Sequence, residues 1–128
     1  MIAREPVCTQ DAPAAIGAYS QGVQAAGWVL TSGQLPMTPA GDLISDDIAE
    51  ATRRSLDNVK AVLAEAGATM ADVVKVTIYL RDMADFAAVN EVYADYFPAP
   101  PPARSCIEVA RLPKDAPLEI EAVAWKQD

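Results

Sequence analysis

The sequence contains no histidine and only two cysteines, Cys8 and Cys106. Without histidine, nucleophiles activated in Ser–His or Cys–His pairs are excluded, and most hydrolase mechanisms are excluded with them. Two cysteines cannot complete a tetrahedral zinc site by themselves, so we expect no metal centre, and we expect both thiols to be free. Acid–base chemistry in this chain therefore falls to carboxylates that act on water.

Clustered positive charge is also missing. The chain has 10 Lys and Arg against 18 Asp and Glu, a net charge of −8 and a pI near 4.4, and Arg53 and Arg54 are its only adjacent basic pair. Nucleic acids bind to clustered cations, so we expect no nucleic-acid partner. Residues 12–41 carry no charge, but glycines and Pro36 interrupt them, so we expect no membrane span. The first thirteen residues lack the apolar core of a secretory signal, which favours a cytoplasmic location.

The chain has the size of one domain. Its 128 residues, 52% of them hydrophobic, can bury roughly two-thirds of the surface that the unfolded chain exposes. We therefore expect a single domain over residues 1–128 that folds without disulfide or metal.

Strand patterns occur in the first third, the middle and the last third of the chain. Residues 23–32 predict a β-hairpin that turns at Gly27, and residues 34–43, with two prolines and a glycine, predict an exposed loop. Residues 73–80 alternate and are rich in β-branched side chains, which predicts a half-covered strand. Its predicted inner face carries Val74, Val76, Ile78 and Leu80. Two more alternating strands are predicted at 103–110 and 118–125.

Two helices are predicted between these strands. Asp47 followed by Glu50 resembles a capping box, and Gly67 stands where a helix C-cap belongs. The apolar stripe of this helix consists of Leu56, Val59, Val62, Leu63 and Ala66. A second helix begins at Asp82 and is stopped by Pro98, and its stripe consists of Phe86, Val89, Tyr93 and Tyr96 or Phe97.

This order of elements predicts an α+β protein with the helices on one face of a sheet. If the other face is left uncovered, it exposes apolar side chains such as Ile107 and Val109, and this favours self-association.

The last two strands carry the residues best suited to chemistry. Alternation puts Arg104, Cys106 and Glu108 on one face of their strand, and Glu119 could face Arg104 across adjacent strands. Spacing alone leaves two interpretations open, an ordinary cross-strand ion pair or an arginine that grips a substrate carboxylate beside a catalytic glutamate. Taken by itself, Cys106 is interpreted as a small buried hydrophobic residue, because the sequence does not show the cationic or helix-end setting that a reactive thiol needs.

The stretch PPARSCIEVARLPKDAPLEIEA, residues 101–122, resembles the conserved pattern of the RidA (YjgF-type) family of enamine/imine deaminases. Four further blocks resemble the family in the same order, namely residues 12–23, 31–36, 55–67 and 85–97. The resemblance implies a chorismate-mutase-like fold with a mixed six-stranded sheet and two helices on one face. It also implies a homotrimer of single domains with sites between subunits.

Carried over residue by residue, the resemblance implies that Arg104 binds the carboxylate of a small imino or enamino acid and that Glu119 activates the attacking water. The positions that match the family's pocket are Cys106, Tyr19, Ser32 and Asn90, with Gly33 beside them. The implied reaction is hydrolysis of 2-aminoacrylate, 2-iminopropanoate or 2-iminobutanoate to a 2-oxo acid and ammonia, without a metal or organic cofactor.

Other functions remain open at this stage. A regulatory module that binds 2-oxo acids without turnover could use the same arginine, and the stretch Pro98–Pro102 is shorter than in the family, which would permit a longer enamine such as 2-aminomuconate. Ribonuclease activity has been attached to similar proteins, but the acidic charge and the absence of histidine weigh against it.

Overall fold

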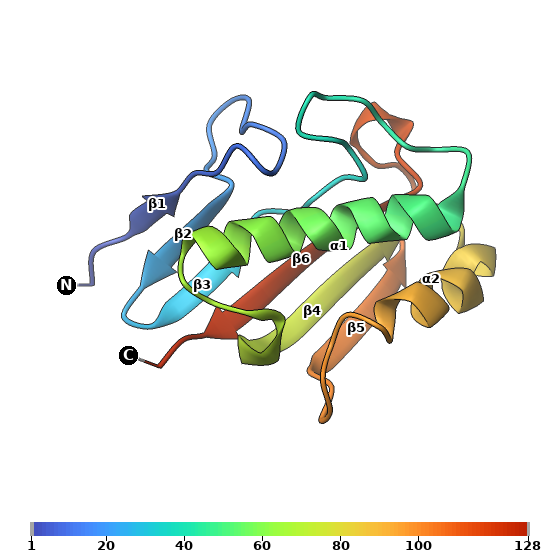
Figure 1. Ribbon diagram of the computed structural model, residues 1–128. Helices are drawn as coiled ribbons and strands as arrows, with labels where there is room; N and C mark the ends of the chain where they lie inside the picture. Colours follow the sequence, from blue (N-terminus) through green and yellow to red (C-terminus); the bar gives the residue numbers. More distant parts are fainter. Residues whose placement is uncertain (1, 128) are drawn as a thin grey trace.

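The computed structural model describes residues 2–127, which form one mixed sheet of six strands with two helices on one face (Figure 1). The strands are β1 (Glu5–Val7), β2 (Gly22–Ala25), β3 (Trp28–Thr31), β4 (Val73–Leu80), β5 (Ala103–Glu108) and β6 (Leu118–Trp125). Their order across the sheet is β1-β2-β3-β6-β4-β5, and only β4 and β5 pair in parallel. The predicted α+β architecture is confirmed.

The predicted hairpin is present as β2 and β3. Its two-residue turn places Ala26 at φ 50° and Gly27 at φ 94°. Turns with both central residues at positive φ match the right-handed twist of paired strands, and glycine adopts this conformation without a steric penalty. The turn therefore fixes the register in which β3 pairs with β2.

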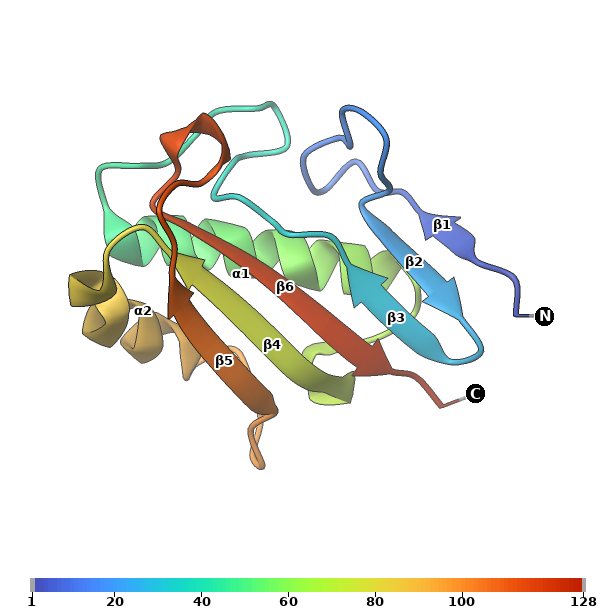
Figure 2. The same ribbon diagram turned by 180° about the vertical axis from the view of Figure 1, so that it is seen from behind.

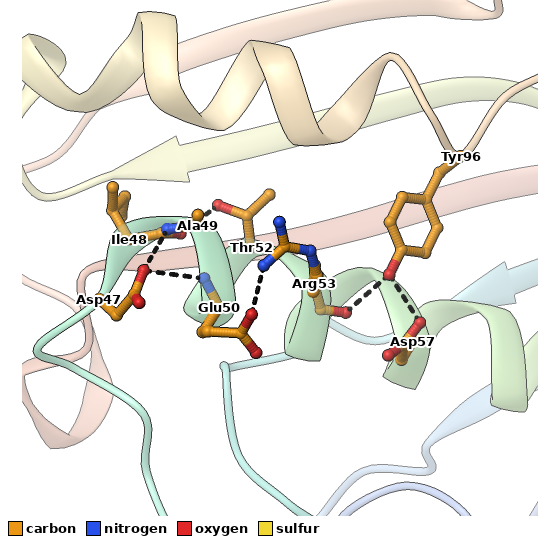
Figure 3. A network of polar contacts seen from close by, with 8 residues as sticks. All are labelled: Asp47, Ile48, Ala49, Glu50, Thr52, Arg53, Asp57 and Tyr96. Carbon is orange, nitrogen blue, oxygen red and sulfur yellow. Dashed lines mark hydrogen bonds and ion pairs between the residues drawn. The ribbon is translucent and has the colours of Figure 1, made fainter.

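Helix α1 (Ile48–Glu65) begins where the sequence predicts. The Asp47 carboxylate accepts hydrogen bonds from the amides of Ala49 and Glu50, at 3.1 and 3.2 Å (Figure 3). The expected reciprocal half of a capping box is not formed, because the Glu50 side chain pairs with Arg53 instead. An N-cap of this kind contributes about 1 kcal/mol to helix stability.

The core lies between α1 and the sheet. The stripe predicted for α1 is buried and meets the helix-facing side chains of β4 and β6. Those side chains are Val76, Ile78, Leu80, Leu118 and Ile120, all 0% exposed. Burying each large aliphatic side chain contributes about 1.5–3 kcal/mol, so this layer holds the helices on one face.

The predicted inner face of β4 is wrong at one position. Val74 is 44% exposed, and Val73 is buried in its place. The register shifts between Val73 and Lys75, where a β-bulge interrupts pairing with β6. A bulge adds one residue to one strand, so the alternation seen in the sequence slips by one position there.

The segment 34–43 is not the wholly exposed loop that its prolines predict. Gln34 is buried and pairs with Ile120 of β6. The buried amide of Asn58 in α1 donates to the carbonyl oxygens of Leu35 at 3.1 Å and Met37 at 2.8 Å. Buried carbonyls need partners, so Asn58 fixes the first half of this segment against the helix.

The second helix is shorter than predicted. A single 3₁₀ turn follows Asp82, and α2 spans Phe86–Tyr93. The Tyr96 hydroxyl then lies between α1 residues, 2.8 Å from Asp57 Oδ1 and 3.4 Å from the Arg53 carbonyl oxygen (Figure 3). Burial and the Asp57 carboxylate raise the pKa of Tyr96 to about 12, so the phenol stays protonated and ties the end of α2 to α1.

Seen from behind, the sheet lies in front of both helices, and no helix or strand of the described part of the chain covers this face (Figure 2). Strand β5 ends at Glu108, two residues before the predicted end, and β6 has the predicted bounds. Neither helix within residues 2–127 combines the length and apolar character needed to cross a bilayer.

Candidate active site

Strand register decides which face each candidate residue occupies. In the parallel pair, Arg104 lies beside Val76 and Cys106 beside Ile78. Both β4 side chains are buried against the helices. Neighbouring residues at one level of a sheet point to the same side, so Arg104 and Cys106 point to the helix-covered face.

Glu119 points to the opposite face. It pairs with Tyr79, whereas the next residue, Ile120, pairs with the buried Ile78. Strand β4 also lies between β5 and β6. The expectation that Glu119 faces Arg104 across adjacent strands is therefore wrong for a single chain, and within residues 2–127 no ion pair joins them. Alternation along each strand does not reveal the strand order or the relative faces.

Glu119 lines a cavity of about 530 Å³ on its side of the sheet. The walls come from the loop before β2, the segment after β3 and the turn before β6. The lining residues are Pro13, Ala14, Ile16, Tyr19, Gln21, Ser32, Gly33, Gln34, Leu35, Met37, Pro113, Lys114 and Glu119. Four predicted site residues, Tyr19, Ser32, Gly33 and Glu119, thus share one cavity.

The Glu119 side chain lies directly against the backbone of Gly33. A Cβ atom built on Gly33 would stand 1.9 Å from Glu119 Oε1 and 2.7 Å from Cδ. Any side chain at this position would have to displace the carboxylate. Glycine at this position leaves the space that the carboxylate occupies, and its backbone does not adopt the left-handed conformation.

Buried Gln21 holds the loop that forms one wall. Its side-chain oxygen accepts from the Thr9 amide at 2.7 Å, and its amide nitrogen donates to the Pro13 carbonyl at 2.8 Å. The Gln21 carbonyl also accepts from the amide of Ser32 at 2.8 Å, and the Ser32 hydroxyl donates to the Ser20 carbonyl. This network places Tyr19 and Ser32 on the same cavity.

Burial raises the pKa of Glu119, and the neighbouring Glu121 carboxylate raises it further. Both effects disfavour the ionised form of Glu119. A carboxyl group whose pKa moves toward neutrality can accept and return a proton near neutral pH, as a general base and then a general acid must.

Arg104 lines a second cavity of about 520 Å³. Its other lining residues are Asn90, Tyr93, Ala94, Phe97, Ala99, Pro101 and Pro102. Arg104 Nη1 donates to Asn90 Oδ1 at 2.7 Å, so these two predicted site residues are in contact. The cavity combines one guanidinium with apolar walls, which suits a small organic anion.

Cys106 lines neither of these two cavities. Burial raises the pKa of its thiol, and the positive charge of Arg104 opposes this only in part. A thiol with a raised pKa is a poor nucleophile, so Cys106 is better suited to packing than to covalent chemistry. Within residues 2–127, no cluster of three or more possible ligands suits a metal ion.

Sequence reasoning missed several residues that line the Glu119 cavity. Leu35 lies within the block of residues 31–36 and Met37 directly follows it, so this block could have indicated both. Lys114 lies within the family-like stretch 101–122, but it was assigned only to the link between two strands, and it reaches the cavity from a turn in which it adopts φ 57°. Tyr93 was assigned only to the apolar stripe of its helix, yet it lines the Arg104 cavity.

The mixed sheet with two helices on one face, together with cavities built around a glutamate and an arginine, is the architecture of a known family. The profile described as Endoribonuclease L-PSP matches residues 9–126, and the chain belongs to this family. The resemblance to RidA (YjgF-type) proteins is confirmed by solved structures. The YjgF gene product of Escherichia coli is 46% identical, with a TM-score of 0.92 over 96% of this chain and 99% of the other.

Individual relatives cover nearly the whole chain. A 2-iminobutanoate/2-iminopropanoate deaminase of Escherichia coli (strain K12) is 50% identical over 124 residues, 94% of this chain and 97% of the relative. A RutC family protein of Pyrococcus abyssi is 48% identical over 127 residues, 98% of this chain and 100% of the relative. The crystal structure of E. coli TdcF with bound serine is 46% identical, with a TM-score of 0.91 over 96% of this chain and 99% of the other.

Proposed function

We propose that this protein is a deaminase that hydrolyses small 2-imino acids and their enamine tautomers to 2-oxo acids and ammonia. The observation that carries the proposal is the half-buried Glu119 carboxyl, which has a raised pKa and lies against Gly33 in a cavity large enough for a small substrate. The 50% identical relative that carries the name of such a deaminase supports it.

The proposed chemistry needs one water and one proton carrier. Glu119 accepts a proton from water as the water oxygen bonds to the carbon of the C=N group, and the electron pair of the double bond moves to nitrogen. Protonated Glu119 returns the proton to that nitrogen. In the resulting carbinolamine, Glu119 takes the proton of the hydroxyl group and passes it to the nitrogen. The C–N bond then breaks, ammonia leaves, and the oxygen becomes the carbonyl of the 2-oxo acid. Proximity and general acid–base catalysis supply the acceleration, and no cofactor takes part.

Arg104 would hold the substrate carboxylate, and we propose that it comes from a second copy of the chain. In one chain, Arg104 and Glu119 point to opposite faces and line different cavities. A homotrimer with sites between subunits would let one subunit present Arg104 to the Glu119 cavity of its neighbour. The apolar side chains exposed on the uncovered face support association, among them Leu30 at 40% and Ile107 at 46%.

The oligomeric state gives a direct check of this arrangement. We expect light scattering coupled to size exclusion to report three times the 13.6 kDa chain mass at micromolar concentration. A stable monomer that retains full activity would contradict an intersubunit site.

The reaction itself is tested with an imine substrate that is formed within the assay mixture. We expect the purified protein to accelerate the conversion of freshly formed 2-iminopropanoate to pyruvate, measured in a coupled assay against the uncatalysed hydrolysis of the same imine. Denatured protein serves as the control for non-specific amine catalysis. An uncatalysed rate in the presence of folded protein would reject the deaminase proposal.

The contact between Gly33 and Glu119 yields a sharper prediction. Gly33→Ala places a methyl group 1.9 Å from Glu119 Oε1, so the carboxylate must move. The clash is with the end of a flexible side chain, so we expect kcat to fall about 10²-fold or more, as misplaced catalytic groups do, with the fold intact. Steady-state kinetics and circular dichroism measure the two effects. Unchanged kcat in a folded Gly33→Ala variant would mean that the position of Glu119 does not matter.

RNA cleavage is not proposed, although the family description contains the word endoribonuclease. The chain carries a net charge of −8 and has no histidine. Both features disfavour binding and cleavage of a polyanion.

A further inference from the structure

We propose that helix α2 carries a positioning platform for Arg104, formed by Phe86, Asn90 and Tyr93, which holds the guanidinium ready for a substrate carboxylate. This inference rests on the proposed function, in which Arg104 is the carboxylate anchor. It also changes the role of Asn90, which the sequence resemblance placed among the residues that line the substrate pocket.

Three contacts define the platform. Asn90 Oδ1 accepts a hydrogen bond from Arg104 Nη1 at 2.7 Å. The Arg104 Cζ atom lies 4.8 Å from the ring centre of Tyr93 and 5.4 Å from that of Phe86. The three platform residues are spaced four and three apart on α2, so they share one face of that helix. Figure 1 shows α2 running over β5, the strand that carries Arg104.

The platform is rigid where it touches the guanidinium. Tyr93 is only 5% exposed, and its ring packs against Phe97 with ring centres 4.7 Å apart. A buried ring cannot follow a moving arginine, so the favoured position of the guanidinium is over the ring face. A cation over an aromatic face is attracted by the negative charge density of the ring.

The contacts leave the carboxylate-binding edge of Arg104 open. A guanidinium has five N–H donors, and Asn90 uses one of them. Within residues 2–127, the Nε and Nη2 atoms of Arg104 donate to no other group. Two parallel N–H donors on one edge are what bidentate recognition of a carboxylate requires. Holding the side chain in advance reduces the rotamer freedom lost when substrate binds.

The ring of Tyr93, and not its hydroxyl group, contacts and positions the Arg104 guanidinium. The hydroxyl oxygen is buried and has no hydrogen-bond partner among the described residues. Phenylalanine at this position would keep the ring face that Arg104 contacts. Leucine would fill a similar space without a π-system. The pair Tyr93→Phe and Tyr93→Leu therefore separates positioning of Arg104 from simple packing.

The expected kinetic signature follows from the chemistry. The substrate carboxylate keeps its charge throughout hydrolysis of the C=N group, so Arg104 binds the ground state and the transition state alike. Loss of the platform should raise KM and leave kcat nearly unchanged. Loss of one cation–π contact corresponds to about a 3- to 30-fold rise in KM.

The test compares Tyr93→Leu and Asn90→Ala with two controls. Tyr93→Phe keeps the ring, and Val92→Ala shortens a buried side chain of the same helix that lines neither cavity of the candidate site. For each variant, KM and kcat are measured with 2-iminopropanoate, and dissociation constants are measured for pyruvate and for its neutral amide, pyruvamide. The amide lacks the charge that Arg104 grips, so it reports general damage to the cavity.

We expect Tyr93→Leu and Asn90→Ala to weaken pyruvate binding about 3- to 30-fold, to leave pyruvamide binding unchanged and to raise KM alone. Tyr93→Phe and Val92→Ala should keep the wild-type preference for the acid. Equal weakening of both ligands in Tyr93→Leu, or an effect of Tyr93→Phe as large as that of Tyr93→Leu, would overturn the platform. Failure of the proposed function is distinguished by the rate of imine hydrolysis. In that case the wild-type protein would not accelerate the reaction, whether or not it prefers pyruvate to pyruvamide.

Discussion

Replacing Arg104 with alanine is expected to abolish measurable acceleration of 2-iminopropanoate hydrolysis. A bidentate pair between the guanidinium and a carboxylate consists of two charge-assisted hydrogen bonds, together worth about 3–6 kcal/mol. Their loss corresponds to a fall in kcat/KM of roughly 10²- to 10⁴-fold. The coupled assay with freshly formed imine measures this directly. Arg104→Lys keeps the charge without the planar fork and should retain an intermediate rate.

Arg111 provides a matched control for the loss of a positive charge. It is exposed and lies three residues beyond the end of β5, and it lines neither cavity of the candidate site. Arg111→Ala should therefore keep the wild-type rate. Rates like those of the wild type in Arg104→Ala would rule out the carboxylate grip.

Mixing two inactive variants tests whether Arg104 and Glu119 act from different subunits. Arg104→Ala and Glu119→Gln are unfolded together in equal amounts and refolded, which mixes the two chains within the proposed trimer. If each site takes one residue from each of two neighbours, about one site in four regains both residues, and about a quarter of the wild-type activity returns. Refolding each variant alone controls for recovery without mixing. If both residues came from one chain, no mixed trimer would contain an intact site, and activity would stay at the level of the variants.

Glu119→Gln is expected to remove turnover while preserving ligand binding. Loss of a general acid–base group lowers kcat by about 10²- to 10⁴-fold. The neutral amide no longer repels an anionic ligand, so the dissociation constant of pyruvate should stay the same or fall. A protein that only senses 2-oxo acids would show the binding result but would have no turnover to lose. Glu119→Gln with a wild-type kcat would exclude Glu119 as the proton carrier.

The same substitution should alter stability in a pH-dependent way. Burial and Glu121 raise the pKa of Glu119 in the folded protein, so ionised Glu119 opposes folding at neutral pH. Glutamine carries no such penalty, so the melting temperature of Glu119→Gln should exceed that of the wild type at pH 7 to 8. The difference should vanish below about pH 4.3, the ordinary glutamate pKa, where Glu119 is neutral in both states. Thermal unfolding between pH 4 and 8 measures it, and a less stable variant at pH 8 would contradict the sign.

Much of the fold could be predicted from local patterns. The alternation in β6, the stripe on α1 and the turn at Gly27 each depend on neighbours in sequence, and the structure keeps all three. Two of the errors arose where distant segments meet. The bulge beside Val74 depends on pairing with β6, and the burial of Gln34 depends on Ile120. Neither contact can be predicted from the residues next to it in the sequence.

The candidate site, too, was predicted from the sequence only in part. The absence of histidine restricts the chemistry to carboxylates, and the spacing of Arg104 and Cys106 correctly puts them on one face of their strand. Only the tertiary structure decided that β4 separates β5 from β6, that Glu119 points to the other face, and that Gly33 touches its carboxylate. The physical reason is that a two-residue period fixes which side chains of one strand share a face, but says nothing about which face another strand presents. That choice is made by long-range pairing and by burial of the apolar face against α1.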